Sequence, residues 1–273
     1  DTTSGKEAAK LFSLIALIMM IAPSIAPTVG TIIMSLADWR WIFYTLAIMA
    51  GLVAILVMRF MPVPTKTVVL DPKQGDPQQK LGLLSVFSEK RALGFMVAQA
   101  FAYSVMMIFL TNASMMYMEI FGRTAEQFSL LFFANICGLV VINRANTFLL
   151  ARYEPEKLLK AFLGLQVLGG IILVVASVVI PDALYVFVAG FVIAIAANGA
   201  VLSNASACFM KHFGHNAGSA SAVLGATQYT VGGMISAFSA FISMGSMQPV
   251  VIVLLVSSII ALTGAVIAAN YAR

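Results

Sequence analysis

Charged residues are scarce in this chain. Asp, Glu, Lys and Arg make up only 10% of its 273 residues, whereas a soluble domain carries about 25%. Hydrophobic residues account for 61%, above the 45–50% or so of a soluble domain. The deficit of charge excludes a soluble globular protein, and membrane topology explains the net charge of +5 better than nucleic-acid binding does. The composition predicts a polytopic membrane protein.

Cysteine and histidine are nearly missing as well. Cys137 and Cys208 both fall in apolar runs, so a disulfide framework is excluded, and both are expected to be buried small side chains. His212 and His215 lie in one polar loop and are expected to be solvated. The sequence holds no His/Cys/Asp/Glu cluster, phosphate loop or nucleophile constellation. We therefore expect no catalytic residue, metal, cofactor or ATP-driven step.

Long apolar runs dominate what remains. A membrane-spanning helix needs about 20 apolar residues, and polar or turn-forming breaks separate eight such runs. We expect an all-α integral membrane protein with spans over residues 11–37, 41–61, 91–118, 126–150, 158–180, 183–209, 216–244 and 248–270. Every carboxylate falls in a loop or at a span end, so none is expected in the middle of the membrane.

The positive charges fix an orientation. If residues 1–10 are cytoplasmic, thirteen Lys and Arg residues lie on the cytoplasmic side and only Arg40 and Arg123 on the other. Cytoplasmic loops carry such an excess. We therefore expect residues 1–10, the segment 62–90 and the C-terminus to be cytoplasmic.

The segment from Pro62 to Lys90 is the long loop of the pattern. Its prolines and charges predict a linker. It leaves two spans before it (residues 1–61) and six after it (residues 91–273). One common class of transporters is built from two six-span bundles joined by a cytoplasmic linker. By that logic four spans are missing at the front, and the chain is expected to be a fragment.

The stretch Ala22–Gly30 is unusual for a helix. Pro23 and Pro27 each remove a backbone donor, which a membrane helix tolerates where neighbours satisfy the freed carbonyls. Ala22, Ala26 and Gly30 repeat every four residues and line one face, which permits close packing. The stretch predicts a kinked helix packed tightly against another; a packing helix without a coupling role is the alternative.

Three groups of motifs resemble one family, the drug/proton antiporters of the major facilitator superfamily, specifically the bicyclomycin-resistance (Bcr/CflA) group. They are Ala22–Gly30 with Asp38-Trp39-Arg40-Trp41-Ile42-Phe43; Phe101-Ala102-Tyr103 with Tyr117-Met118-Glu119-Ile120-Phe121-Gly122 and Phe128-Ser129-Leu130-Leu131-Phe132; and Ala197-Asn198-Gly199-Ala200 with Ala217-Gly218-Ser219-Ala220-Ser221-Ala222-Val223-Leu224-Gly225. The resemblance covers nearly the whole chain except the linker.

The resemblance implies a major-facilitator-type bundle of which this chain carries helices five to twelve. It makes Ala22, Pro23, Ala26, Pro27 and Gly30 the antiporter-motif helix. The energy source would be the proton gradient, and the proton-carrying carboxylate would come from the missing first helices. A monomer is expected when the protein is full length.

The polar residues inside the spans are the candidates for a pathway, because polar groups are costly in a bilayer. They are Gln99, Tyr103, Asn112, Asn135, Asn143, Asn146, Gln166, Asn198, Asn204, Gln228 and Tyr229. The family's cavity helices favour six substrate-binding residues: Tyr103, Met106, Asn112, Asn198, Asn204 and Gln228. For each, an interhelical hydrogen bond worth about 0.6 kcal/mol is the alternative.

Arg144 lies inside the fourth span, near its cytoplasmic end. It either snorkels to the headgroups or forms a gate with the loop that begins at Arg152. The function indicated is proton-coupled efflux of amphipathic drug-like molecules. The alternative is a membrane protein that does not transport, either a truncated product or a partner subunit.

Overall fold

The computed structural model describes residues 29–30, 32–60, 83–213 and 217–270. The chain divides into an N-terminal unit, Asp1–Lys80, and a C-terminal unit, Leu81–Arg273. The antiporter-motif residues Ala22, Pro23, Ala26 and Pro27 and most of the linker lie outside the described residues. Gly30 is described, and it is helical.

The described part of the N-terminal unit contains one long helix, α2 (Arg40–Phe60). Its start coincides with the polar break predicted at Asp38–Arg40. The guanidinium of Arg40 lies 3.7 Å from the Asp38 carboxylate and 4.7 Å from the centre of the Trp39 ring. Both side chains of the ion pair are largely exposed, so the pair contributes little to stability.

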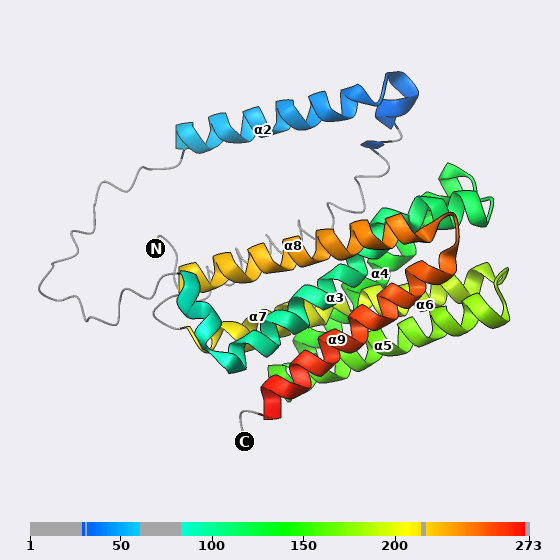
Figure 1. Cartoon of the computed structure of the whole chain (residues 1–273). Coiled ribbons are helices and arrows are strands. Elements are labelled where there is room, and N and C mark those ends of the chain that lie inside the picture. Colours follow the sequence, from blue (N-terminus) through cyan, green and yellow to red (C-terminus); the bar gives the residue numbers. More distant parts are fainter. Residues whose placement is uncertain (1–28, 31, 61–82, 214–216, 271–273) are drawn as a thin grey trace, which may run out of the picture. The chain divides into compact units, whose positions relative to one another are not determined.

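The C-terminal unit is a bundle of long helices (Figure 1). A short 3-10 helix, η2 (Leu83–Ser88), leads into α3 (Lys90–Ser114), which continues as one π-helical turn, η3 (Met115–Ile120). The remaining helices are α4 (Ala125–Leu149), α5 (Pro155–Val179), α6 (Leu184–Ala196), α7 (Asn198–Met210), α8 (Ala217–Ser243) and α9 (Met247–Asn270).

Local sequence explains several of the helix ends. Thr124 caps α4: its hydroxyl accepts from the Gln127 amide, and the Gln127 side chain accepts from the Thr124 amide, both at 3.3 Å. Pro155 occupies the first position of α5, where its missing N–H costs nothing. Gly122 (φ 61°) and Gly245 (φ 78°) adopt left-handed conformations in the turns before α4 and α9.

The predicted fold class is confirmed: the described residues form helices and no strands, and six helical segments are long and apolar enough to cross a membrane. The described helices follow seven of the eight predicted spans, and most of the span 11–37 lies outside the described residues. α8 has the length but is not one of the six segments, because Gly, Ser and Thr lower its hydropathy.

The predicted span 183–209 corresponds to one membrane-crossing segment, Leu184–Met210. Within this segment the structure adds a detail that the sequence-based prediction does not include, because Ala197 separates α6 from α7. The Ala197 amide reaches the Ile193 carbonyl only at 3.4 Å. Apolar periodicity does not reveal this break. The local sequence signal is the Asn198-Gly199 pair that directly follows Ala197, because Asn-Gly often marks a turn.

Helix α3 packs against α7, α8 and α9. It crosses α9 at two glycines: a Cβ on Gly94 would lie 2.7 Å from the Gly264 carbonyl and 2.7 Å from the Ala268 Cβ. Helices α5 and α6 meet in the same way, since a Cβ on Gly169 would lie 2.6 Å from the Ala194 amide. Close backbone approach through small residues is typical of membrane bundles.

Candidate functional site

Polar side chains form a seam where α3, α7 and α8 meet. Gln99 of α3 donates from Nε2 to Oε1 of Gln228 on α8 at 2.6 Å. The Gln99 Oε1 accepts from the Ser206 hydroxyl of α7 at 2.9 Å. Gln99 is buried, whereas Gln228 and Ser206 are half-buried. The Gln99 side-chain amide therefore joins three helices, and its two partners, Gln228 and Ser206, lie near the surface of the unit.

An aromatic pair lies next to this seam. The rings of Tyr103 and Tyr229 meet edge to face at 5.3 Å, an arrangement that aromatic pairs favour. Gly232 of α8 allows the approach, because a Cβ there would lie 2.9 Å from the Tyr103 ring. Tyr103 and Met106 are half-buried, and Tyr229 is exposed. These side chains offer an apolar surface with hydroxyl groups.

Asn112 is placed differently from Tyr103, although both are on α3. It is 2% exposed and donates to the Ile108 carbonyl at 2.8 Å and to the Ser239 hydroxyl of α8 at 3.0 Å. One turn away, Thr111 and Ser236 form a second α3–α8 hydrogen bond. Within the described unit Asn112 holds two helices together.

Helices α4 and α7 are joined by asparagines. Asn204 donates to Asn146 Oδ1 at 2.7 Å, and both are buried. Asn143 donates to the Gly199 carbonyl at 2.9 Å. Asn198, the first residue of α7, is also buried, at 2% exposure. Of the six predicted substrate-binding residues, Tyr103, Met106 and Gln228 thus reach the surface of the unit, and Asn112, Asn198 and Asn204 do not.

The two arginines predicted to gate lie on or beside α4. Arg144 and Arg152 are exposed, and among the described residues no carboxylate lies within 4.0 Å of either guanidinium. The described structure therefore shows no ion pair of Arg144 or Arg152 with a carboxylate that would form a gate. Their gating role stays a prediction.

The described carboxylates avoid the middle of the spans. Asp38, Glu89, Glu154 and Asp182 lie between or just before helices, Glu126 and Glu156 in first turns, and Glu119 in the last turn of the α3–η3 segment. No group of three His, Cys, Asp or Glu side chains in the described residues could hold a metal ion.

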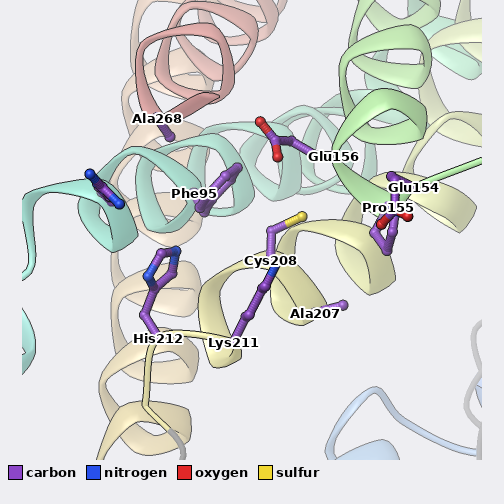
Figure 2. Close-up of a pocket in the computed structure, with 10 residues that line it drawn as sticks. Phe95, Glu154, Pro155, Glu156, Ala207, Cys208, Lys211, His212 and Ala268 are labelled. Atoms are coloured by element: carbon purple, nitrogen blue, oxygen red, sulfur yellow. The ribbon is translucent and has the colours of Figure 1, made fainter. Parts of the chain in front are cut away.

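A pocket of about 450 Å³ opens at the end of the bundle where α3 and α5 begin and α7 and α9 end (Figure 2). Its floor is apolar and includes Phe95, Cys208 and Ala268, all buried. The Phe95 ring stacks on His212 with centroids 6.3 Å apart. Charges of both signs line it, namely Arg91, Glu154, Glu156 and Lys211. None of the four forms an ion pair within 4.0 Å with a described residue.

Comparison with known proteins identifies the family. The model of the Major Facilitator Superfamily matches residues 1–237. The chain belongs to this superfamily. It is therefore a multi-pass membrane protein of a family of transporters, as its apolar helices indicate.

Three relatives refine the placement within the superfamily. The chain is 26% identical over 254 residues to a bicyclomycin resistance protein homolog of Haemophilus influenzae, covering 91% of this chain and 62% of that protein. It is 27% identical over 242 residues to the uncharacterized MFS-type transporter YdgK of Bacillus subtilis (86% and 59%). It is 25% identical over 269 residues to the multidrug resistance protein MdtL of Salmonella typhi (96% and 64%). The predicted resemblance to the bicyclomycin-resistance group is confirmed.

The chain spans about three-fifths of the length of these relatives.

The sequence predicts Tyr103 and Gln228 as substrate-binding residues, but it does not predict the residues that contact them in the structure. Gln99 and Tyr229 are among the polar residues of the spans but not among the six predicted substrate-binding residues, and the sequence does not single out Ser206. Serines are frequent in these helices, so only the hydrogen bond to Gln99 distinguishes Ser206.

Proposed function

We propose that the protein exports amphipathic, drug-like small molecules across the bacterial inner membrane in exchange for protons. The observation that carries the proposal is the set of relatives named for bicyclomycin and multidrug resistance, which align over 91% and 96% of this chain. The membrane-crossing helices and the family support transport as the general activity.

The substrate route would pass the surface formed by α3, α7 and α8. Tyr103, Met106 and Gln228 would contact the substrate, and Gln99 and Ser206 would orient the Gln228 amide through their hydrogen bonds. Methionine and aromatic side chains adapt to ligands of different shape. The uncharged amide and hydroxyl groups would then satisfy polar atoms of the ligand.

Asn112, Asn198 and Asn204 have a different place in this proposal. Their burial argues against contact with the substrate. Asn112 and Asn204 would instead hold the α3–α8 and α4–α7 contacts through their hydrogen bonds, whereas the Asn198 side chain has no such bond among the described residues. The kinked helix with Ala22, Pro23, Ala26, Pro27 and Gly30 would pack between the two halves of the transporter. Arg144 would form a gating contact with the loop that begins at Arg152.

Proton coupling needs a titratable group in the membrane that substrate and proton compete for. Each described carboxylate lies in a loop or in an end turn. The coupling group would therefore come from another part of the gene product. Residues 1–10, 62–90 and the C-terminus would face the cytoplasm, in agreement with the excess of Lys and Arg there.

The test is dye efflux from bacteria that express the gene product containing this sequence. Export of an amphipathic dye above the empty-vector level, abolished by a protonophore, supports the proposal. Tyr103→Ala should reduce export, whereas Tyr185→Ala, at a tyrosine that is 81% exposed at the start of α6, should not. An inserted protein that exports no dye and no other tested drug supports the alternative of a membrane protein that does not transport.

A further inference from the structure

Asn198 carries two buried polar atoms without partners. Its side chain is 2% exposed, and neither Oδ1 nor Nδ2 has a hydrogen-bond partner among the described residues. The other buried asparagines of the C-terminal unit each donate at least one hydrogen bond. A buried amide left unsatisfied at both atoms is rare and costly, so its ligand has to be found.

The position of Asn198 is as unusual as its burial. It follows the break at Ala197, with thirteen helical residues of α6 before the break and thirteen of α7 from Asn198 onward. It therefore lies near the centre of the membrane-crossing segment Leu184–Met210. Interrupted helices in membranes expose backbone groups that neighbours, side chains or ordered waters must satisfy.

A third unpartnered atom lies at the same level of the bundle. Gln166 on α5 is fully buried and donates from Nε2 to the Ala194 carbonyl at 3.3 Å and to the Ala102 carbonyl at 3.4 Å. Its Oε1 has no partner among the described residues. The antiparallel contacts of Gly169 with Ala194 and of Leu173 with Gly190 set the register of α5 and α6. This register places Gln166 beside the helix break.

From these three atoms we infer that the break between α6 and α7 binds ordered water, one or two molecules held by Asn198 and by Gln166 Oε1. A water can accept from Asn198 Nδ2 and donate to the two amide oxygens, and buried waters typically make about three hydrogen bonds of this kind. The atoms include a donor as well as acceptors, and none belongs to a carboxylate, which favours water over a cation.

The inference does not depend on the proposed function. The water would satisfy the buried side-chain atoms of Asn198 and Gln166 beside the break, and Asn198 would position it. Gly199 contributes to the same geometry, because a Cβ on it would clash with the Leu139 carbonyl of α4. The break between α6 and α7 thus has small residues around it and three polar atoms that are unpartnered in the described part of the chain, two on Asn198 and one on Gln166 of the neighbouring helix α5.

The direct test is water-edited solid-state NMR on the gene product in lipid bilayers, with ¹⁵N-labelled Asn and Gln side chains. The Asn198 and Gln166 amides should receive magnetisation from water, and the matched buried Asn112 amide, which is bonded to Ile108 and Ser239, should not. Assignment uses loss of each signal in the corresponding variant. No transfer to Asn198 overturns the inference.

A second test compares two substitutions by thermal unfolding. Asn198→Ser keeps a donor and an acceptor and leaves room for water, so its midpoint should stay near that of the parent. Asn198→Leu, of similar size, removes the two Asn198 atoms that hold the water and should lower the midpoint by about 3 °C or more. It should also reduce water transfer to Gln166. A midpoint equal to or above that of the parent for Asn198→Leu, with unchanged transfer to Gln166, contradicts the inference.

Discussion

The side-chain amides of Gln99 and Gln228 meet at 2.6 Å across 129 residues of sequence, and together they join α3 to α8. The bond is partly buried, and Ser206 occupies the remaining acceptor of Gln99. This contact connects the fold to the proposed substrate surface, because Gln228 is half-buried beside Tyr103 and Tyr229.

The first prediction concerns the coupling between these two amides. Gln99→Leu and Gln228→Leu should each lower the free energy of unfolding. The double variant should lose less free energy of unfolding than the sum of the two single losses. The coupling should be about 0.5–1.7 kcal/mol, the range for hydrogen bonds between membrane helices. Thermal unfolding of the parent, the two single variants and the double variant in one detergent completes this double-mutant cycle. Strictly additive losses would show that the bond contributes nothing.

A second prediction concerns the glycine crossing of α3 and α9. Gly94→Ala should cost about 1–3 kcal/mol, because the new Cβ meets the Gly264 carbonyl and the Ala268 Cβ at 2.7 Å. Gly164→Ala on α5 is the matched control, since nothing lies within 4 Å of a Cβ there. Ala is the better helix former, so this control should be neutral or stabilising by unfolding midpoint. Equal losses of stability for Gly94→Ala and Gly164→Ala would contradict the close crossing of α3 and α9 at Gly94.

The cap of α4 gives a third prediction. Thr124→Ala removes the acceptor of the Gln127 amide and should cost about 1 kcal/mol. Thr147→Ala serves as control, because Thr147 is exposed in the helix interior and bonds only its own turn, through the Asn143 carbonyl. Hydrogen exchange at the first amides of α4 should rise in the first variant alone. Unchanged exchange there would remove the capping role.

Tyr103 gives a fourth prediction, about function. Tyr103→Phe keeps the edge-to-face contact with Tyr229 and should retain most of the efflux, while losing affinity for substrates that bond the hydroxyl. Tyr103→Ala removes the aromatic surface and should raise the dye concentration needed for half-maximal export by about tenfold, equivalent to about 1.4 kcal/mol. Full activity of Tyr103→Ala at unchanged expression would exclude this residue from the route.

Helix boundaries were largely predictable from the sequence. The breaks at Asp38–Arg40 and Arg152–Lys157 contain the starts of α2 and α5, and Pro181-Asp182 lies between α5 and α6. This follows because a span needs about 20 apolar residues and its ends need polar or turn-forming ones. Both signals are local, so composition along the chain is enough to find them.

The sequence did not predict which polar side chains form hydrogen bonds between helices and which reach the surface. Asn112 and Tyr103 lie nine residues apart on α3 and both read as polar residues in an apolar span, yet one is fully buried against Ser239 and the other reaches the surface. The break at Ala197 has no periodicity signal either. Gln166 donates to the Ala194 carbonyl just before the break, and Gly199 packs against the Leu139 carbonyl just after it. The sequence does not reveal these contacts between distant segments.

The central claim is proton-driven export, and reconstituted proteoliposomes test it most directly. The purified gene product would be placed in vesicles with an amphipathic fluorescent dye and an imposed pH gradient. The account predicts dye movement against protons that stops with a protonophore and falls with Tyr103→Ala but not with Tyr185→Ala. Folded protein whose vesicles show no gradient-dependent dye movement would contradict it.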